Sequence, residues 1–207
     1  MKSIINKNNV DTTKQPLFFG EGLNLQRYDK YRYKKIYDLF LQQLSFFWRP
    51  EEVDLSGKEK NDYETLTDHQ KFIFTKNLGY QILLDSVQSR GISHLLEDCS
   101  NPEFEAFAKS WEFFETLHSY SYTYIIKNVY PNPSEVFDNI LSDPEIIKRT
   151  TSVTKYYDDL IETIPDESIN DRKKKLYLTL VSINILEGIR FYVSFACSYC
   201  FAQNKTM

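Results

Sequence analysis

The segment from Pro102 to Tyr130 constrains the fold most, because it predicts one long helix with clear signals at both ends. It opens on Ser100-Asn101-Pro102-Glu103, where a polar N-cap precedes a proline at the first helical position, and Pro131 ends it. At about 100° per residue its apolar side chains form one stripe. The stripe consists of Phe104, Phe107, Trp111, Ile125 and Val129. We therefore expect this helix to pack against other helices.

Three ionisable residues fall inside the same stripe, namely Glu115, His118 and Tyr122, within an arc roughly 80° wide. An ionised carboxylate buried alone is very costly, so it must be paired, protonated or bound to a metal. Spacing alone would favour an ordinary Glu-x-x-His pair on a helix surface. The apolar residues around the pair favour metal ligands instead.

The rest of the chain predicts further helices and shows no alternation typical of strands. Thr67 and Gln70 form a capping box, and we expect Asp171 to cap the last helix. The basic run from Arg172 to Lys175 is expected to be a solvated face. The expected helices cover 29–48, 67–90, 102–130, 134–141, 143–162 and 171–202, with a loop over 51–65. The predicted fold is an all-α helical bundle over residues 28–207, preceded by an extended arm over 1–27.

Two other helices carry one inward acid each. Asp85 shares a helix face with Phe74 and Leu78, although an acid near a helix end could simply be solvated. Glu187 lies in a helix that is apolar all round, where a salt bridge to Arg190 is the alternative to a metal. Each of these two acids thus leaves two interpretations open.

Composition and charge exclude several function classes. A net charge of −4 and a pI of about 5.5 argue against a nucleic-acid partner. Residues 176–201 are long enough to span a membrane, but their two charges would each cost about 2.5–3.5 kcal/mol there. We therefore expect a buried helix of a soluble protein and no membrane. Cys99, Cys197 and Cys200 are expected to be buried thiols in a reducing cytoplasm.

Carboxylates from three helices and one Glu-x-x-His match part of the ligand pattern of ferritin-like dinuclear proteins. In that pattern two helices give one acid each and two give Glu-x-x-His. Oxygen-rich ligation suits iron or manganese better than zinc. A second Glu-x-x-His does not occur in the sequence, and we expect the remaining histidines, His69 and His94, to be surface or capping residues.

Four separated motifs closely resemble the small (beta, radical-generating) subunit of class I ribonucleotide reductase. They are SFFWRPEE at 45–52, LLDS at 83–86, WEFFETLHSYSY at 111–122 and LEGIRFY at 186–192. The resemblance extends over residues 15–202. It implies a ferritin-like fold and a dinuclear iron site, with manganese as the other metal, held by Asp85, Glu115, His118 and Glu187.

The resemblance also implies roles in radical chemistry. Tyr122 would bear the radical, with Phe191 and Phe195 as the apolar shell around it. Trp48 would begin the long-range radical-transfer route to a large (alpha) catalytic subunit, which reduces ribonucleotides to deoxyribonucleotides. The small subunit would be a homodimer in the cytoplasm, or in the host cytoplasm if a phage encodes it.

Family chains continue past Ala202, and that continuation carries the second Glu-x-x-His. We therefore expect this chain to be the N-terminal part of a split small subunit, completed by a second polypeptide that is the C-terminal fragment. The alternative, of another class, is a non-catalytic helical fragment that regulates reductase assembly. A different ferritin-like oxidase is a third interpretation, against which the segment around Trp48 argues.

Overall fold

The computed structural model describes residues 6–55, 57–162 and 164–207. Regular structure in this part of the chain is helical, apart from one isolated bridge between Phe18 and Cys99, so the all-α prediction is confirmed. The chain divides into two compact units. The first comprises residues 1–48 and 89–115, and the second comprises 49–88 and 116–207.

In the first unit, the chain before the first helix pairs with the segment that leads into α4 (Pro102–Val129). The Phe19 amide donates to the Asp98 carbonyl at 2.9 Å, and the Ser100 amide donates to the Leu17 carbonyl at 3.0 Å. Asn101 then caps α4, because its side-chain oxygen accepts the Phe104 amide at 3.0 Å. The start of α4 is therefore anchored by the arm.

Helix α1 (Lys34–Ser45) is shorter at both ends than the predicted 29–48. Before it, Glu103 Oε1 accepts the amides of Arg32 at 2.8 Å and Tyr33 at 3.4 Å. Because these two amides are hydrogen-bonded to Glu103, the helix begins after them, later in the chain than predicted. No residue of α1 is buried within this chain.

The predicted loop over 51–65 is wrong, because it contains the 3₁₀ turn η1 (Pro50–Glu52) and helix α2 (Lys58–Thr65). Helix α2 has no apolar stripe that a sequence pattern could reveal. Lys58 and Asp62 form an ion pair one turn apart at 2.7 Å, which supports the helix locally.

Helix α3 (Asp68–His94) begins at the predicted capping box. The Thr67 amide donates to Gln70 Oε1 at 2.9 Å, and the Gln70 amide donates to Thr67 Oγ1 at 3.3 Å. The helix passes the predicted end at Arg90 and continues through Gly91. Fully buried Ile92 lies just beyond the glycine, and its packing offsets the roughly 1 kcal/mol that a helical glycine costs.

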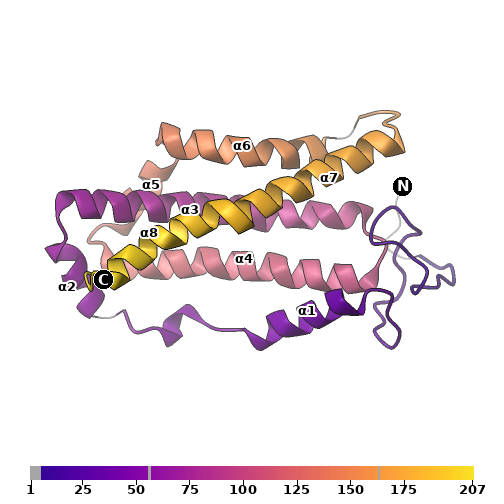
Figure 1. Cartoon of the computed structure of the whole chain (residues 1–207), viewed down its shortest axis with the longest axis horizontal. Coiled ribbons are helices and arrows are strands. Elements are labelled where there is room, and N and C mark those ends of the chain that lie inside the picture. The colour runs from indigo at the N-terminus through magenta and orange to yellow at the C-terminus, as the bar shows by residue number, and fades with distance from the viewer. Residues whose placement is uncertain (1–5, 56, 163) are drawn as a thin grey trace. The chain divides into compact units, whose positions relative to one another are not determined.

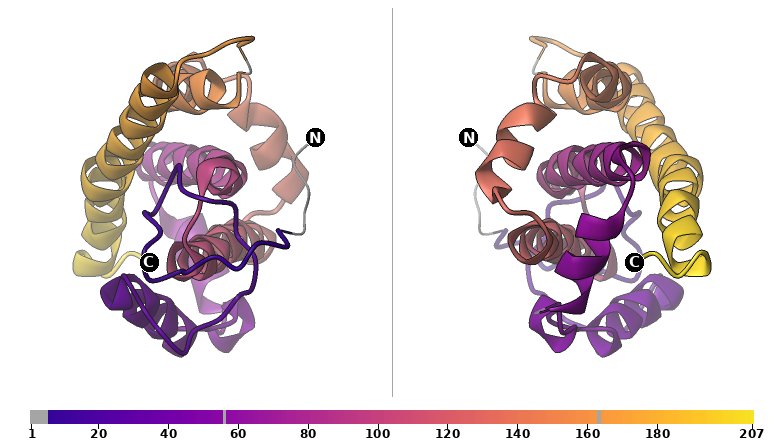
Figure 2. Two further views of the ribbon diagram at one scale, coloured as in Figure 1. Left: turned by 90° about the vertical axis from the view of Figure 1, so that its right-hand side faces the viewer. Right: turned by 90° about the vertical axis from the view of Figure 1, so that its left-hand side faces the viewer.

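The second unit has an apolar core shared by α3, α4, α5 (Pro133–Ile140) and α6 (Pro144–Ile161). Figure 2 shows α5 leading from the end of α4 to the start of α6. The buried members of this core are Leu78, Ile82, Ile126, Val129, Tyr130, Ile140 and Ile146. The Tyr130 hydroxyl is 2.8 Å from the Thr75 hydroxyl, and burial raises the pKa of Tyr130.

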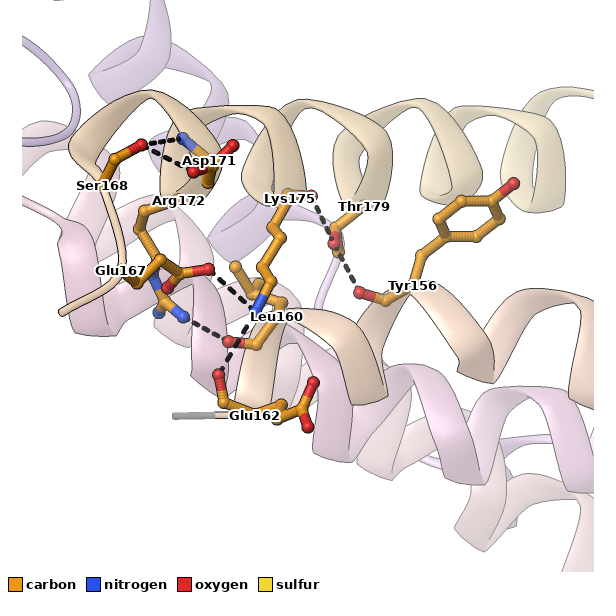
Figure 3. A network of polar contacts seen from close by, with 9 residues as sticks. All are labelled: Tyr156, Leu160, Glu162, Glu167, Ser168, Asp171, Arg172, Lys175 and Thr179. Carbon is orange, nitrogen blue, oxygen red and sulfur yellow. Dashed lines mark hydrogen bonds and ion pairs between the residues drawn. The ribbon is translucent and has the colours of Figure 1, made fainter. Parts of the chain in front are cut away.

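The turn between α6 and α7 (Ile169–Ile185) is closed by polar contacts (Figure 3). Ser168, and not Asp171, is the N-cap, since its hydroxyl accepts the Asp171 amide at 3.1 Å. Arg172 donates to the Leu160 carbonyl, and Lys175 pairs with Glu167 at 2.9 Å. The basic run is therefore not simply a solvated face.

Helix α7 continues through a π-helical turn, η3 (Leu186–Arg190), into α8 (Phe191–Gln203), drawn orange to yellow in Figure 1. The sequence predicted one uninterrupted helix here. By length and composition, the stretch Ile169–Gln203 could cross a membrane. Core helices of soluble proteins can meet the same two criteria. Only 28% of an apolar 18-residue stretch of this helix is buried within this chain. The expectation of a buried helix is therefore wrong for this chain by itself.

Of the three cysteines, only Cys99 has the expected burial. Cys99 is buried, Cys197 is half-buried and Cys200 is exposed, and all three are free thiols. Burial raises the pKa of Cys99 to about 11, which disfavours the thiolate form at neutral pH.

Candidate metal centre

Asp85 from α3 meets two residues of α4 in the second unit. Its side chain is buried, with the residue 2% exposed, so the solvated alternative for Asp85 is wrong. The Tyr122 hydroxyl donates to Asp85 Oδ2 at 2.6 Å. His118 Nδ1 lies 3.8 Å from the same oxygen. One carboxylate therefore faces both the imidazole and the phenol that the sequence analysis placed on one stripe.

Glu115 lies one turn before His118 on the uninterrupted helix α4, at the residue where the two units join. It is 3% exposed, and the Trp111 indole N–H donates to its Oε1 at 2.7 Å. One ligand atom from each of Asp85, Glu115 and His118 lies within 4.8 Å of the others. These three residues are therefore spaced as ligands of one cation would be.

Glu187 lies in the π-helical turn η3 and contacts α3 through Gln88. Gln88 Nε2 donates to Glu187 Oε1 at 2.9 Å, and Gln88 is one turn after Asp85 on α3. Arg190, the alternative partner of Glu187, donates instead from Nη1 to the Arg149 carbonyl at 3.0 Å. The same nitrogen donates to the Ser152 hydroxyl at 2.9 Å, so Arg190 links η3 to α6.

The aromatic residues named with the resemblance lie in different places. Phe191 is buried and stacks on Phe195 with ring centroids 6.0 Å apart, while Phe195 is 38% exposed. Tyr122 packs against the buried core of the second unit described above. Trp48 is half-buried and ends the first segment of the first unit.

The other two histidines lie at the two ends of α3. His94 Nδ1 lies 2.8 Å from Glu97 Oε1 near the end of α3. His69 is exposed in the first turn of that helix. The expectation of a surface histidine is confirmed for His69, whereas His94 is half-buried.

Three polar residues around the acids were missed from the sequence. Trp111 was assigned only to the apolar stripe, although its N–H holds Glu115. Gln88 is fully buried, and the buried Tyr157 donates its hydroxyl proton to Gln88 Oε1 at 2.6 Å. The position of Gln88, three residues after Asp85 on the same helix face, was the one available signal.

The donor set fits a divalent first-row metal. Carboxylate oxygens with one imidazole suit iron or manganese, while tetrahedral zinc sites favour thiolate and several imidazoles. Two of the acids are almost completely buried, and a bound cation would offset the desolvation of their charges.

Comparisons with known proteins identify the family of this chain. The family model described as "Ribonucleotide reductase, small chain" matches residues 26–207. The ribonucleoside-diphosphate reductase subunit beta of Haemophilus influenzae is 47% identical over 97% of this chain and 58% of its own length. The subunit beta of Enterobacteria phage T4 is 43% identical over 99% of this chain and 59% of its own. The chain thus spans slightly under three fifths of these relatives.

A likeness to a solved structure supports the fold. The Ribonucleotide reductase R2 subunit from Clostridium botulinum superimposes with a TM-score of 0.88 at 24% identity. The match covers 98% of this chain and 62% of that one. The predicted ferritin-like class is therefore confirmed.

Proposed function

Because the chain belongs to the ribonucleotide reductase small-chain family, we propose that its inward acids and His118 hold part of a dinuclear iron site, with manganese as the alternative metal. The proposed ligands are Asp85, Glu115, His118 and Glu187. The observation that carries this proposal is the cluster of Asp85, Glu115 and His118, whose ligand atoms lie within 4.8 Å of one another. The burial of Asp85 and Glu115 supports the proposal further.

Tyr122 is the residue from which an electron is proposed to be removed. Molecular oxygen, reduced with the help of the bound metals, would supply the oxidising power for this step. Loss of an electron makes a phenol strongly acidic, so its proton must leave at the same time. Asp85 Oδ2, 2.6 Å from the Tyr122 hydroxyl, is placed to accept that proton. The radical would then remain on a ring that packs against the apolar core of the second unit, away from water and reductants.

We also propose the roles of the three remaining aromatic residues from the family pattern. Phe191 and Phe195 would complete the dry surroundings of the radical, and Trp48 would begin its route to the large subunit. The buried stacking of Phe191 supports the first role. The SFFWRPEE motif supports the second.

The completed protein is proposed to supply a radical to a large catalytic subunit that reduces ribonucleotides to deoxyribonucleotides. It would act as a homodimer in the cytoplasm, with no direct nucleic-acid or membrane partner. The printed names of the Haemophilus influenzae and phage T4 relatives, ribonucleoside-diphosphate reductase subunit beta, support a diphosphate substrate.

The remaining metal ligands are proposed to come from a second polypeptide that carries another Glu-x-x-His. The only Glu-x-x-His of this sequence is Glu115 with His118. The apolar face of η3 and α8 would be the docking surface, because large apolar side chains there are exposed within this chain. They are Ile189, Tyr192, Val193 and Tyr199. Contiguous exposed apolar residues of this kind mark interaction sites.

Electron paramagnetic resonance tests the proposal directly. Ferrous iron and oxygen are added to the chain alone, to a C-terminal small-subunit fragment alone, and to their mixture. We expect a tyrosyl radical signal only in the mixture, and none when Tyr122→Phe replaces the wild-type chain. A mixture that associates but gives no signal would support the non-catalytic alternative, a regulator of assembly.

A further inference from the structure

We propose that Tyr157 and Gln88 together set the orientation of the Glu187 carboxylate, so that Glu187 is ready to bind a metal. The inference rests on the proposed function, in which Glu187 is a ligand. Neither residue touches the metal in this account. Both are positioning residues that act through Glu187.

The three side chains form a chain of hydrogen bonds across three elements of the second unit. Tyr157, on α6, donates its hydroxyl proton to Gln88 Oε1, on α3, at 2.6 Å. Gln88 Nε2 then donates to Glu187 Oε1, on the π-helical turn η3, at 2.9 Å. Gln88 is fully buried and Tyr157 is 3% exposed, so bulk water does not compete for the bond between them, while Glu187 is half-buried.

The direction of the bonds follows from what each atom can do. An amide oxygen can only accept, so a hydroxyl facing it must donate. With its oxygen held by Tyr157, the Gln88 amide is fixed with its NH₂ group toward Glu187. An amide NH₂ can only donate, so the facing carboxylate oxygen must accept. The Gln88 amide therefore holds Glu187 Oε1 in one orientation.

Without the Tyr157 hydroxyl, the Gln88 amide could rotate by half a turn and present its oxygen to Glu187. Two acceptor oxygens would then face each other, so the hydrogen bond that orients Glu187 would be lost. The Tyr157 hydroxyl thus disfavours the rotamer of Gln88 in which the amide oxygen faces Glu187. Partners that orient a metal ligand in this way typically change metal affinity about 10–100-fold when they are removed.

The neighbouring residue provides a matched control. Tyr156 precedes Tyr157 on α6, and within the described part of the chain its hydroxyl makes no hydrogen bond. Tyr156→Phe and Tyr157→Phe each delete one hydroxyl from the same helix. Only the second breaks the contact to Gln88.

The experiment is a Mn²⁺ titration of each variant, alone and mixed with the completing C-terminal fragment, followed by the six-line signal of free Mn²⁺. Thermal unfolding of the metal-free variants runs in parallel. We expect Tyr157→Phe to weaken Mn²⁺ binding about 3–10-fold and Gln88→Met about 10–100-fold, with Tyr156→Phe unchanged. In a Gln88→Met background, Tyr157→Phe should change the affinity by less than about 2-fold, because its target is gone.

Equal Mn²⁺ affinities of Tyr157→Phe and Tyr156→Phe would overturn the inference and leave the proposed function standing. The same conclusion follows if Tyr157→Phe lowers only the unfolding temperature of the metal-free chain, since a packing role would do that. Absence of Mn²⁺ binding by the wild type in both settings would overturn the proposed function, and the inference with it.

Discussion

Individual hydrogen bonds hold the proposed ligands in place. Trp111 lies one turn before Glu115 on α4, and its indole N–H donates to that carboxylate at 2.7 Å. The bond fixes one oxygen of Glu115 while the ring remains part of the apolar stripe. Asp85 is held in the same way by the Tyr122 hydroxyl. These two donors thus position the carboxylates of Glu115 and Asp85.

Trp111→Phe is expected to weaken metal binding about 10-fold, because phenylalanine keeps an aromatic ring but lacks the N–H donor. Isothermal titration with Mn²⁺ measures the change in the mixture of this chain and its completing fragment. Phe107→Leu, one turn earlier on the same stripe, is the control for lost aromatic packing. Equal affinities of wild type and Trp111→Phe would show that the indole does not position Glu115.

Candidate site residues could be predicted from the sequence, but the contacts that they make across helices could not. Glu115, His118 and Tyr122 were found because the 3.6-residue period places them in one apolar stripe. The approach of Asp85 to His118 depends on how α3 packs on α4, which no single-helix pattern contains. Gln88 and Tyr157 were missed for the same reason, since a buried polar pair becomes visible only when both partners are placed.

At the scale of the elements, helix ends follow local chemistry. Asp143 caps α6, where its Oδ1 accepts the amides of Glu145 at 2.9 Å and Ile146 at 3.2 Å. Lys76, on α3, forms an ion pair with the same carboxylate. The Lys76 ammonium, together with these amides, lowers the pKa of Asp143. One side chain thus both starts α6 and ties it to α3.

The lowered pKa of Asp143 predicts a loss of stability in acid. Its contribution is fully present above the ordinary aspartate pKa, near pH 4, and is lost as the pH falls through the lower folded value. We expect Asp143→Asn, which can still cap the helix, to cost up to about 1 kcal/mol at pH 7. Urea unfolding at pH 7 and pH 3 measures the difference. If the difference in unfolding free energy between wild type and Asp143→Asn is as large at pH 3 as at pH 7, the lowered pKa of Asp143 is contradicted.

Elements with strong local signals were predicted well. The capping box at Thr67 and the prolines at positions 102 and 144 marked the starts of α3, α4 and α6 correctly. Helix α2 was missed because it has no apolar face. Ser168 was missed as the N-cap of α7 because aspartate, the residue type of Asp171, is an equally good N-cap. The π-helical turn at Glu187 has no sequence signature, since an α-helix and a π-turn share the same residue preferences.

At the scale of the whole molecule, the exposed apolar side chains of α8 belong to the proposed docking surface for the C-terminal fragment. Val193 is 70% exposed and Tyr199 is 71% exposed within this chain. Replacing both by lysine should abolish association with the C-terminal fragment and reduce self-association of the lone chain. Leu141→Lys, at a residue 67% exposed between α5 and α6, is the matched control. Analytical ultracentrifugation distinguishes these outcomes, and undiminished association of the double variant would contradict this docking surface.

We propose above all that Asp85, Glu115, His118 and Glu187 form an incomplete metal cage that another polypeptide completes. The most direct measurement is the metal content of the chain alone and of its complex with the C-terminal fragment, after anaerobic loading with ferrous iron and desalting. The account predicts little retained iron alone, two iron ions per complex, and loss of iron in a Glu115→Gln complex. Tight stoichiometric iron in the lone chain, or full iron in the Glu115→Gln complex, would contradict it.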